Sequence, residues 1–198
     1  MMKPFVLGLT GSIGMGKSTT AKMFADAGIP VWDADATVHQ IYTGNSPVVQ
    51  QIAEMYPKAV KNKEVDRQIL KNLISRDQSI LKKLEGIVQP SIAASRKNFI
   101  LNAVSDIVII DHPLLLESKS DAYCDAVLVV TIDADTQKHR VLAREKMDIK
   151  TFDIIRSKQM PTAEKCKYAD YIIETTTLSA ARMQVETVIS KIREQLNA

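Results

Sequence analysis

The residues with the clearest chemical meaning run from Gly11 to Ser18, where GSIGMGKS matches the pattern G-x-x-x-x-G-K-[ST] in full. In such a loop, glycines let successive backbone N–H groups point at one phosphate, and the following helix adds a partial positive charge. Lys17 would bridge the β- and γ-phosphates of a nucleotide, and the Ser18 hydroxyl would coordinate Mg²⁺. The alternative is a glycine-rich strand–helix turn with a chance lysine. The predicted nucleotide-binding residues of the loop are Gly11, Ser12, Ile13, Gly14, Met15, Gly16, Lys17, Ser18 and Thr19.

Carboxylates follow two other apolar runs. Asp111 ends the run Ile107–Ile110, so with Ser18 it is a predicted metal residue, and Glu117 is a weaker candidate for the same metal. The alternative for Asp111 is a strand end capped at the turn before Pro113.

Asp33 and Asp35 follow the short run Pro30–Trp32. A carboxylate there can accept the proton of an attacking hydroxyl, so we predict Asp33 as the catalytic base. The alternative is turn and N-cap chemistry, and we expect Asp35 to cap the helix that follows.

Positive charge is concentrated between Lys138 and Lys167, where nine Lys/Arg residues face four Asp/Glu residues. Arg140 and Arg144 lie four residues apart and would share one helix face. Arginines of a mobile lid neutralise charge on a transferred phosphoryl group, so Arg140 is predicted to be catalytic and Arg144 to bind the nucleotide. The alternative is a solvated basic helix face. We expect no nucleic-acid partner, because the whole chain carries a formal net charge of only +3.

The elements that must position these residues form an α/β pattern. Short apolar runs predict buried parallel strands over 5–9, 30–33, 107–110, 126–130 and 170–173. A helix is predicted over 17–27, with Ala21, Phe24 and Ala25 facing inward and Gly28 as its C-cap, and an amphipathic helix over 179–196 with Val185, Ile189, Ile192 and Leu196 inward. We therefore predict a P-loop NTPase core with a parallel sheet flanked by helices.

Three parts are predicted along the chain. The core would comprise residues 1–35, 104–137 and 168–198, with a lid over 138–167 built from two helices around residues 146–148. Residues 36–103 would form a helical region without strands, with helices over 36–42, 48–55, 67–75 and 80–88. Such an insertion would hold a second substrate, because ligands of open α/β sheets bind beyond the carboxyl ends of the strands.

Composition bounds the remaining possibilities. The 198 residues are 45% hydrophobic and 25% charged, which excludes a disordered or fibrous chain. No apolar run approaches the roughly 20 residues that span a bilayer, and the two cysteines lack zinc-site spacing. We expect a cytoplasmic protein without a membrane partner, monomeric or weakly homo-oligomeric. Asn62-Lys63-Glu64-Val65 lacks the aspartate of the N-K-x-D guanine motif, which disfavours a switch GTPase but leaves a nucleotide kinase or a P-loop binding protein open.

The chain resembles the dephospho-CoA kinase family from end to end. The matching strings are Gly8–Thr19, Asp33-Ala34-Asp35 with His39–Tyr42, Asp66-Arg67, Leu84–Val88, Asp111–Glu117, Gln137–Arg140 with Arg144, Gln159, and Ala169-Asp170. The resemblance implies that ATP and dephospho-CoA are the substrates. With Mg²⁺ as cofactor, the ATP γ-phosphoryl would pass to the ribose 3′-hydroxyl, giving CoA and ADP in the final step of coenzyme A biosynthesis.

The chain departs from the family pattern at two places. Gln89-Pro90 stands where the family often has His-Pro, and Glu174-Thr175-Thr176 stands where it commonly has an asparagine followed by a glycine. The first departure concerns a substrate-side contact and the second an adenine-side contact.

Overall fold

The structure is a computed structural model that describes residues 3–145 and 147–198. It divides into two compact units. The core unit comprises Met1–Trp32 and Ala103–Ala198, and the helical unit comprises Asp33–Asn102.

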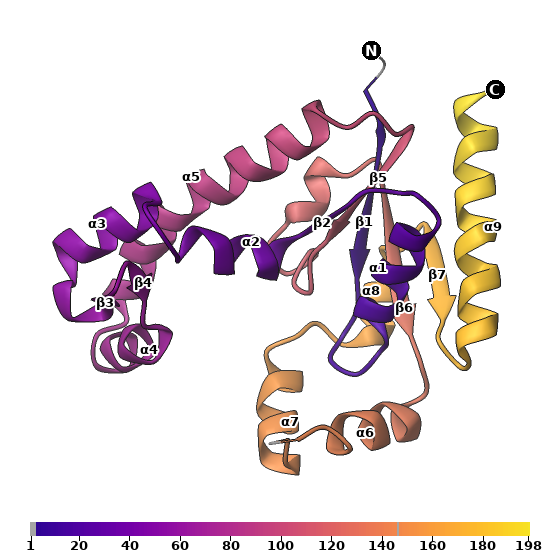
Figure 1. The fold of residues 1–198 in the computed structure, drawn as a ribbon. Helices are drawn as coiled ribbons and strands as arrows, with labels where there is room; N and C mark the ends of the chain where they lie inside the picture. Colours follow the sequence, from indigo (N-terminus) through magenta and orange to yellow (C-terminus); the bar gives the residue numbers. More distant parts are fainter. Residues whose placement is uncertain (1–2, 146) are drawn as a thin grey trace. The chain divides into compact units, whose positions relative to one another are not determined.

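A five-stranded sheet with the order β2-β5-β1-β6-β7 forms the centre of the core unit (Figure 1). Its strands are β1 (Phe5–Thr10), β2 (Val31–Asp33), β5 (Ile107–Asp111), β6 (Ala126–Thr131) and β7 (Tyr171–Glu174). β1 pairs in parallel with β5 and β6, and β6 pairs in parallel with β7. All five predicted strands form, but β2 and β7 are not buried as predicted, because they are the two edge strands of the sheet and both carry exposed residues. Every residue of β5 is buried, as expected for a strand covered on both faces.

Helices α1 (Lys17–Asp26), α8 (Thr162–Cys166) and α9 (Leu178–Leu196) pack against strands of this sheet. The other two helices of the unit, α6 (Ala134–Leu142) and α7 (Ile149–Ser157), pack against each other. α9 packs against α1 and runs beside β7 (Figure 1). Gly28 has a φ of +82°, which confirms the predicted left-handed position after α1.

Two predicted inward positions of these helices are wrong. Ala25 is exposed, and Met23 is buried in its place beside Phe24. Leu196 is also exposed, because it lies in the last turn of α9, beyond the final buried residue Ile192.

The helical unit has an apolar core of its own around Val48, Ile52 and Leu84. Its helices are α2 (Ala34–Ile41), α3 (Pro47–Met55), α4 (Arg67–Arg76) and α5 (Ser79–Leu101). The prediction of a region without strands is wrong, because β3 (Val60–Lys61) and β4 (Glu64–Val65) pair antiparallel. Both turn residues between them, Asn62 and Lys63, have positive φ, as a tight two-residue hairpin turn requires. Strands of two residues are too short to show an alternating pattern.

α5 is longer than the helix predicted over 80–88, because it continues through Pro90 to Leu101. Proline inside a helix removes one backbone hydrogen bond and usually ends the helix. Here α2, α3 and α4 all pack against α5, and this tertiary packing supports a helix that the proline would otherwise tend to end. Within the described ranges, no helix is long and apolar enough to cross a membrane.

Candidate active site

The loop between β1 and α1 has the backbone that its glycines predict. Gly14 and Gly16 have φ values of +81° and +89°, a region that residues with a Cβ rarely adopt. A Cβ on Gly11 would lie 2.3 Å from Val130 Cγ2, so this glycine is required by close packing instead. The three glycines therefore shape one loop for two different physical reasons.

Lys17 and Asp111 form an ion pair at the end of this loop. Lys17 Nζ lies 2.6 Å from Asp111 Oδ1, and their side chains are 15% and 4% exposed. Lys17 is therefore largely enclosed although it lies at the start of a helix after a loop. The sheet explains the pairing, since β1 and β5 are neighbours and Leu9 stands opposite Asp111 in their register.

The residues predicted to bind a metal fit Mg²⁺. Ser18 is exposed in the first turn of α1, and Asp111 supplies a carboxylate next to Lys17. No group of three or more His, Cys, Asp or Glu side chains gathers as a metal site within the described ranges. None is required, because nucleotide-bound Mg²⁺ keeps several waters and takes further ligands from the phosphates. Glu117 makes other contacts, with Lys165 and with the backbone N–H of Met160.

Arg140 lies beside the same loop. Its Nη1 donates to Thr175 Oγ1 at 3.0 Å, and its Nη2 donates to the Thr175 carbonyl oxygen at 2.7 Å. The Thr175 hydroxyl in turn donates to the Met15 carbonyl oxygen at 2.9 Å. A pocket of about 400 Å³ opens here, lined by Gly14, Gly16, Thr19, Thr20, Met23, Arg140, Arg144, Thr175, Thr176, Thr177, Leu178 and Ala181. The structure therefore gathers both predicted arginines and the phosphate loop around one pocket.

Two glutamines bind the backbone of Ile13, one at its N–H and the other at its carbonyl oxygen. Gln137 Nε2 donates to the Ile13 carbonyl oxygen at 2.7 Å, and the Ile13 N–H donates to Gln159 Oε1 at 3.0 Å. Next to it, the hydroxyls of Ser12 and Thr162 lie 3.2 Å apart. Sequence reasoning assigned no role to Gln159, Thr162 or Thr175. Two of these residues could have been noticed in the sequence. Gln159 matches the family pattern, and Thr175 lies where the chain departs from it.

Asp33 is the last residue of β2 and the N-cap of α2. Its Oδ1 accepts a hydrogen bond from the Ala36 N–H at 2.9 Å. The prediction that Asp35 caps this helix is wrong, because the helix begins two residues earlier than expected and Asp35 lies inside its first turn. The Asp33 side chain is exposed, so it can cap the helix and still meet a substrate.

A polar pocket of about 570 Å³ lies within the helical unit. It is lined by His39, Tyr42, Thr43, Lys61, Asn62, Glu64, Val65, Asp66 and Arg67. The Arg67 guanidinium lies over the Tyr42 ring, 5.5 Å from its centroid. Burial raises the pKa of the Tyr42 hydroxyl, and the charge of Arg67 lowers it in part. Tyr42 is therefore a neutral platform for a cation at the edge of the pocket.

A parallel sheet with a phosphate loop after its central strand, a carboxylate ending the next strand and basic helices after β6 defines a P-loop kinase. Comparison with known proteins narrows this class. The model of the dephospho-CoA kinase family matches residues 5–180. A dephospho-CoA kinase from Cereibacter sphaeroides is 48% identical over 197 residues, which cover 100% of both chains.

Two solved structures are also similar to this chain. The Thermus thermophilus protein TT1252 aligns with a TM-score of 0.84 and 27% identity, over 98% of this chain and 99% of that protein. Dephospho-CoA kinase from Campylobacter jejuni aligns with a TM-score of 0.70 and 26% identity, over 96% of this chain and 98% of that enzyme. The chain belongs to the dephospho-CoA kinase family, and it is an ATP-dependent kinase. This membership decides against a switch GTPase and against a P-loop protein without catalytic activity.

Proposed function

We propose that this protein transfers the γ-phosphoryl group of ATP to the 3′-hydroxyl of dephospho-CoA, giving CoA and ADP. The observation that carries the proposal is the complete phosphate loop with Lys17 paired to Asp111, in a chain that matches the family over its full length. ADP release is measured with ATP and Mg²⁺ plus dephospho-CoA, adenosine or UMP in separate reactions. Of the three acceptors, we expect only dephospho-CoA to give ADP release. Turnover with UMP would instead indicate a nucleotide kinase, and the absence of turnover with all three acceptors would indicate a binding protein.

In the proposed mechanism, the loop amides and Lys17 bind the β- and γ-phosphates, while Arg144 adds charge beside the pocket. When the nucleotide binds, its phosphates would become the anionic partners of Lys17. The Asp111 carboxylate would then be available to bind Mg²⁺. Ser18 and Asp111 would hold Mg²⁺, which supplies positive charge to the phosphate oxygens when bound. Asp33 accepts the proton of the 3′-hydroxyl as that oxygen attacks the γ-phosphorus.

Arg140 has a distinct role in the proposal, which is to neutralise charge that develops as the phosphoryl group transfers. Arg140→Ala should therefore lower kcat by more than tenfold while weakening ground-state ATP binding far less. Single-turnover kinetics and ATP titration measure the two effects. Lys138→Ala, an exposed neighbour on α6, is the control and should stay within about twofold of wild type. An Arg140 variant equal to this control would contradict the proposed catalytic role of Arg140.

The segment 138–167 is proposed to act as the lid. Its amides should gain protection from hydrogen exchange when ATP binds, because phosphate charge offsets the repulsion among its basic side chains. Exchange measured with and without ATP tests this expectation, and equal protection in both states would contradict it.

The helical unit is proposed to bind dephospho-CoA, through its pocket lined by His39, Tyr42, Lys61 and Arg67. Arg67→Ala should raise KM for dephospho-CoA about tenfold and leave KM for ATP unchanged, because a charged contact with an anionic substrate is worth about 1.5–3 kcal/mol. Steady-state kinetics with each substrate varied in turn measures this effect. Arg76→Ala, an exposed arginine at the other end of α4, is the control. An equal rise in KM for both substrates would contradict the assignment.

The proposal also includes a cytoplasmic site of action and a monomeric or weakly homo-oligomeric state without a nucleic-acid partner. In its support, Cys124 and Cys166 are thiols in the part of the chain that the structure describes, as a reducing compartment favours. The formal net charge of +3 is small for a nucleic-acid binder. Size-exclusion chromatography at two concentrations tests the oligomeric state.

A further inference from the structure

Among the Lys and Arg side chains of the basic segment 138–167 that the structure describes, Lys165 is the one that is completely buried. It lies in α8, and its side chain is 0% exposed, although its neighbours Glu164 and Lys167 face solvent. Burial of an ammonium group is costly unless the charge is paired and its hydrogen bonds are satisfied. This lysine therefore contributes nothing to a basic surface, and the partners that enclose it must explain its position.

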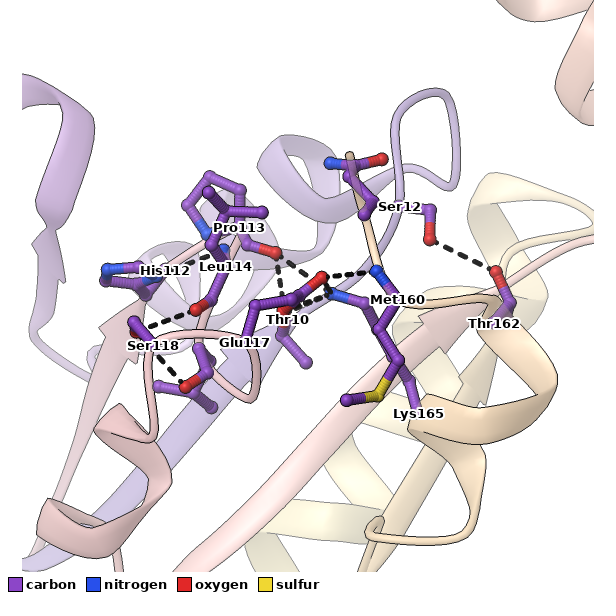
Figure 2. A network of polar contacts seen from close by, with 12 residues as sticks. Thr10, Ser12, His112, Pro113, Leu114, Glu117, Ser118, Met160, Thr162 and Lys165 are labelled. Atoms are coloured by element: carbon purple, nitrogen blue, oxygen red, sulfur yellow. Dashed lines mark hydrogen bonds and ion pairs between the residues drawn. The ribbon is translucent and has the colours of Figure 1, made fainter. Parts of the chain in front are cut away.

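Glu117 is the charged partner of Lys165 (Figure 2). Lys165 Nζ lies 2.9 Å from Glu117 Oε1, and it donates to the Pro113 carbonyl oxygen at 3.0 Å and to Thr10 Oγ1 at 3.4 Å. Glu117 Oε1 also accepts a hydrogen bond from the Met160 N–H at 2.7 Å. The ammonium group thus has partners for all three of its protons.

These partners belong to three segments that the proposed reaction uses. Thr10 is the last residue of β1 and directly precedes the phosphate loop, and Pro113 follows the proposed metal residue Asp111 by two positions. Met160 adjoins Gln159, which accepts the hydrogen bond of the Ile13 N–H. The ion pair therefore lies where the phosphate loop, the turn after β5 and the end of the basic segment meet (Figure 2).

The charge on Glu117 is stabilised by these contacts. Partial burial alone would raise its pKa, but hydrogen bonds from Lys165 and from the Met160 N–H outweigh burial and lower the pKa. A buried ion pair is weak evidence for stability, because its desolvation offsets much of its attraction. What such a pair can provide instead is a single defined arrangement of the segments that it joins.

We propose that Glu117 and Lys165 are a positioning pair, which holds residues 159–165 on the turn after β5 and thereby keeps Gln159 on the Ile13 amide of the phosphate loop. This inference deepens the proposed function and rests on it. It divides the basic segment in two: the part around α8 is anchored to the core, and only the part before Gln159 can act as a moving lid. Neither residue touches a reacting atom.

The first test is a double-mutant cycle of Glu117→Gln and Gln159→Ala. Each single substitution should lower kcat about tenfold and leave KM for dephospho-CoA unchanged. The double variant should lose no more than either single variant, because both changes remove the same contact. Independent, multiplying losses would overturn the proposal. Neither change removes apolar core volume, but Glu117→Gln leaves the buried Lys165 charge without its charged partner, so kinetics are measured well below the melting temperature of each variant.

A second readout does not depend on the substrate. The Ile13 amide should exchange its proton about tenfold faster in Glu117→Gln than in wild type, measured by NMR without any nucleotide. An unchanged rate would overturn the positioning role even if activity falls. If wild type itself does not turn over dephospho-CoA, the proposed function fails, while this measurement still decides the role of the pair.

A matched pair of variants separates positioning from stability. Lys165→Met together with Glu117→Gln replaces the ion pair by neutral groups of similar size, which often restores much of the stability that either single change loses. We expect the melting temperature to recover and kcat to stay low. Recovery of both would show a purely structural role and contradict the proposal. Lys167→Met with Glu164→Gln removes an exposed ion pair on the same helix and should change neither quantity.

Discussion

Replacing Lys17 with alanine is expected to lower kcat by about 10²–10³-fold, the usual loss when one preorganised charge at a transferring group is removed. Lys17 follows the phosphate loop, and its side chain points to the carboxyl end of β5, where Asp111 lies. Its charge would be most important as negative charge spreads over the γ-phosphoryl oxygens. Steady-state and single-turnover kinetics with ATP and dephospho-CoA measure the effect, and a variant that keeps more than about a tenth of the wild-type rate would contradict it.

The burial of Asp111 adds a second expected result for this variant. Without Lys17 the Asp111 carboxylate keeps its enclosed position but loses its cationic partner, so the melting temperature should fall as well. Kinetics must therefore be measured well below the melting temperature of the variant. Lys22→Ala, which removes an exposed ion pair with Asp26 on the same helix, is the control and should alter neither quantity.

Replacing Asp33 with asparagine is expected to lower kcat by roughly 10²–10⁴-fold with ATP affinity almost unchanged, because the variant loses the proton acceptor and keeps the side-chain shape. The structure indicates that this substitution removes the proton acceptor without removing the helix cap. Asp33 caps α2 through the Ala36 N–H, and asparagine caps helices as well as aspartate does. Stability should therefore be retained, and turnover together with ATP titration measures the catalytic loss.

Asp133 provides the matched control for this experiment. It caps α6 with the same geometry, accepting from the Thr136 N–H at 2.8 Å, and the proposed mechanism gives it no other role. Asp133→Asn should behave as wild type. If Asp33→Asn weakens ATP binding and leaves turnover at saturation intact, Asp33 serves the metal or the fold, and the base lies elsewhere.

The core fold could be predicted from local sequence because its three central strands, β5, β1 and β6, are almost entirely buried. In the strand Ile107–Asp111, for example, residues 107–110 form an uninterrupted apolar run, which is typical of a buried parallel strand. The helical unit was harder to predict. Its hairpin strands have two residues each, and α5 crosses Pro90 because other helices pack along it. Both features depend on neighbours that no local pattern shows.

The phosphate loop shows the same division at the level of the site. The spacing of its glycines and Lys17 predicted the turn and its chemistry, since backbone conformation depends on the residues in the turn itself. Asp33 and Asp35 could be assigned to one strand end, but which of them caps α2 was decided by where the helix begins. A difference of two residues in the start of a helix is beyond the precision of sequence patterns.

The sequence by itself therefore determined the class of fold, the phosphate loop and the segments that carry the candidate catalytic groups. Only the tertiary structure decided the surroundings of individual side chains. Lys165 reads as one more residue of a basic surface, yet it is buried against Glu117, 48 positions away. Gln159 matches the family pattern, but its partner, the Ile13 amide, lies 146 positions away and could not be identified from the sequence. The physical reason is that backbone conformation depends on near neighbours, whereas burial and pairing depend on which distant segments pack together.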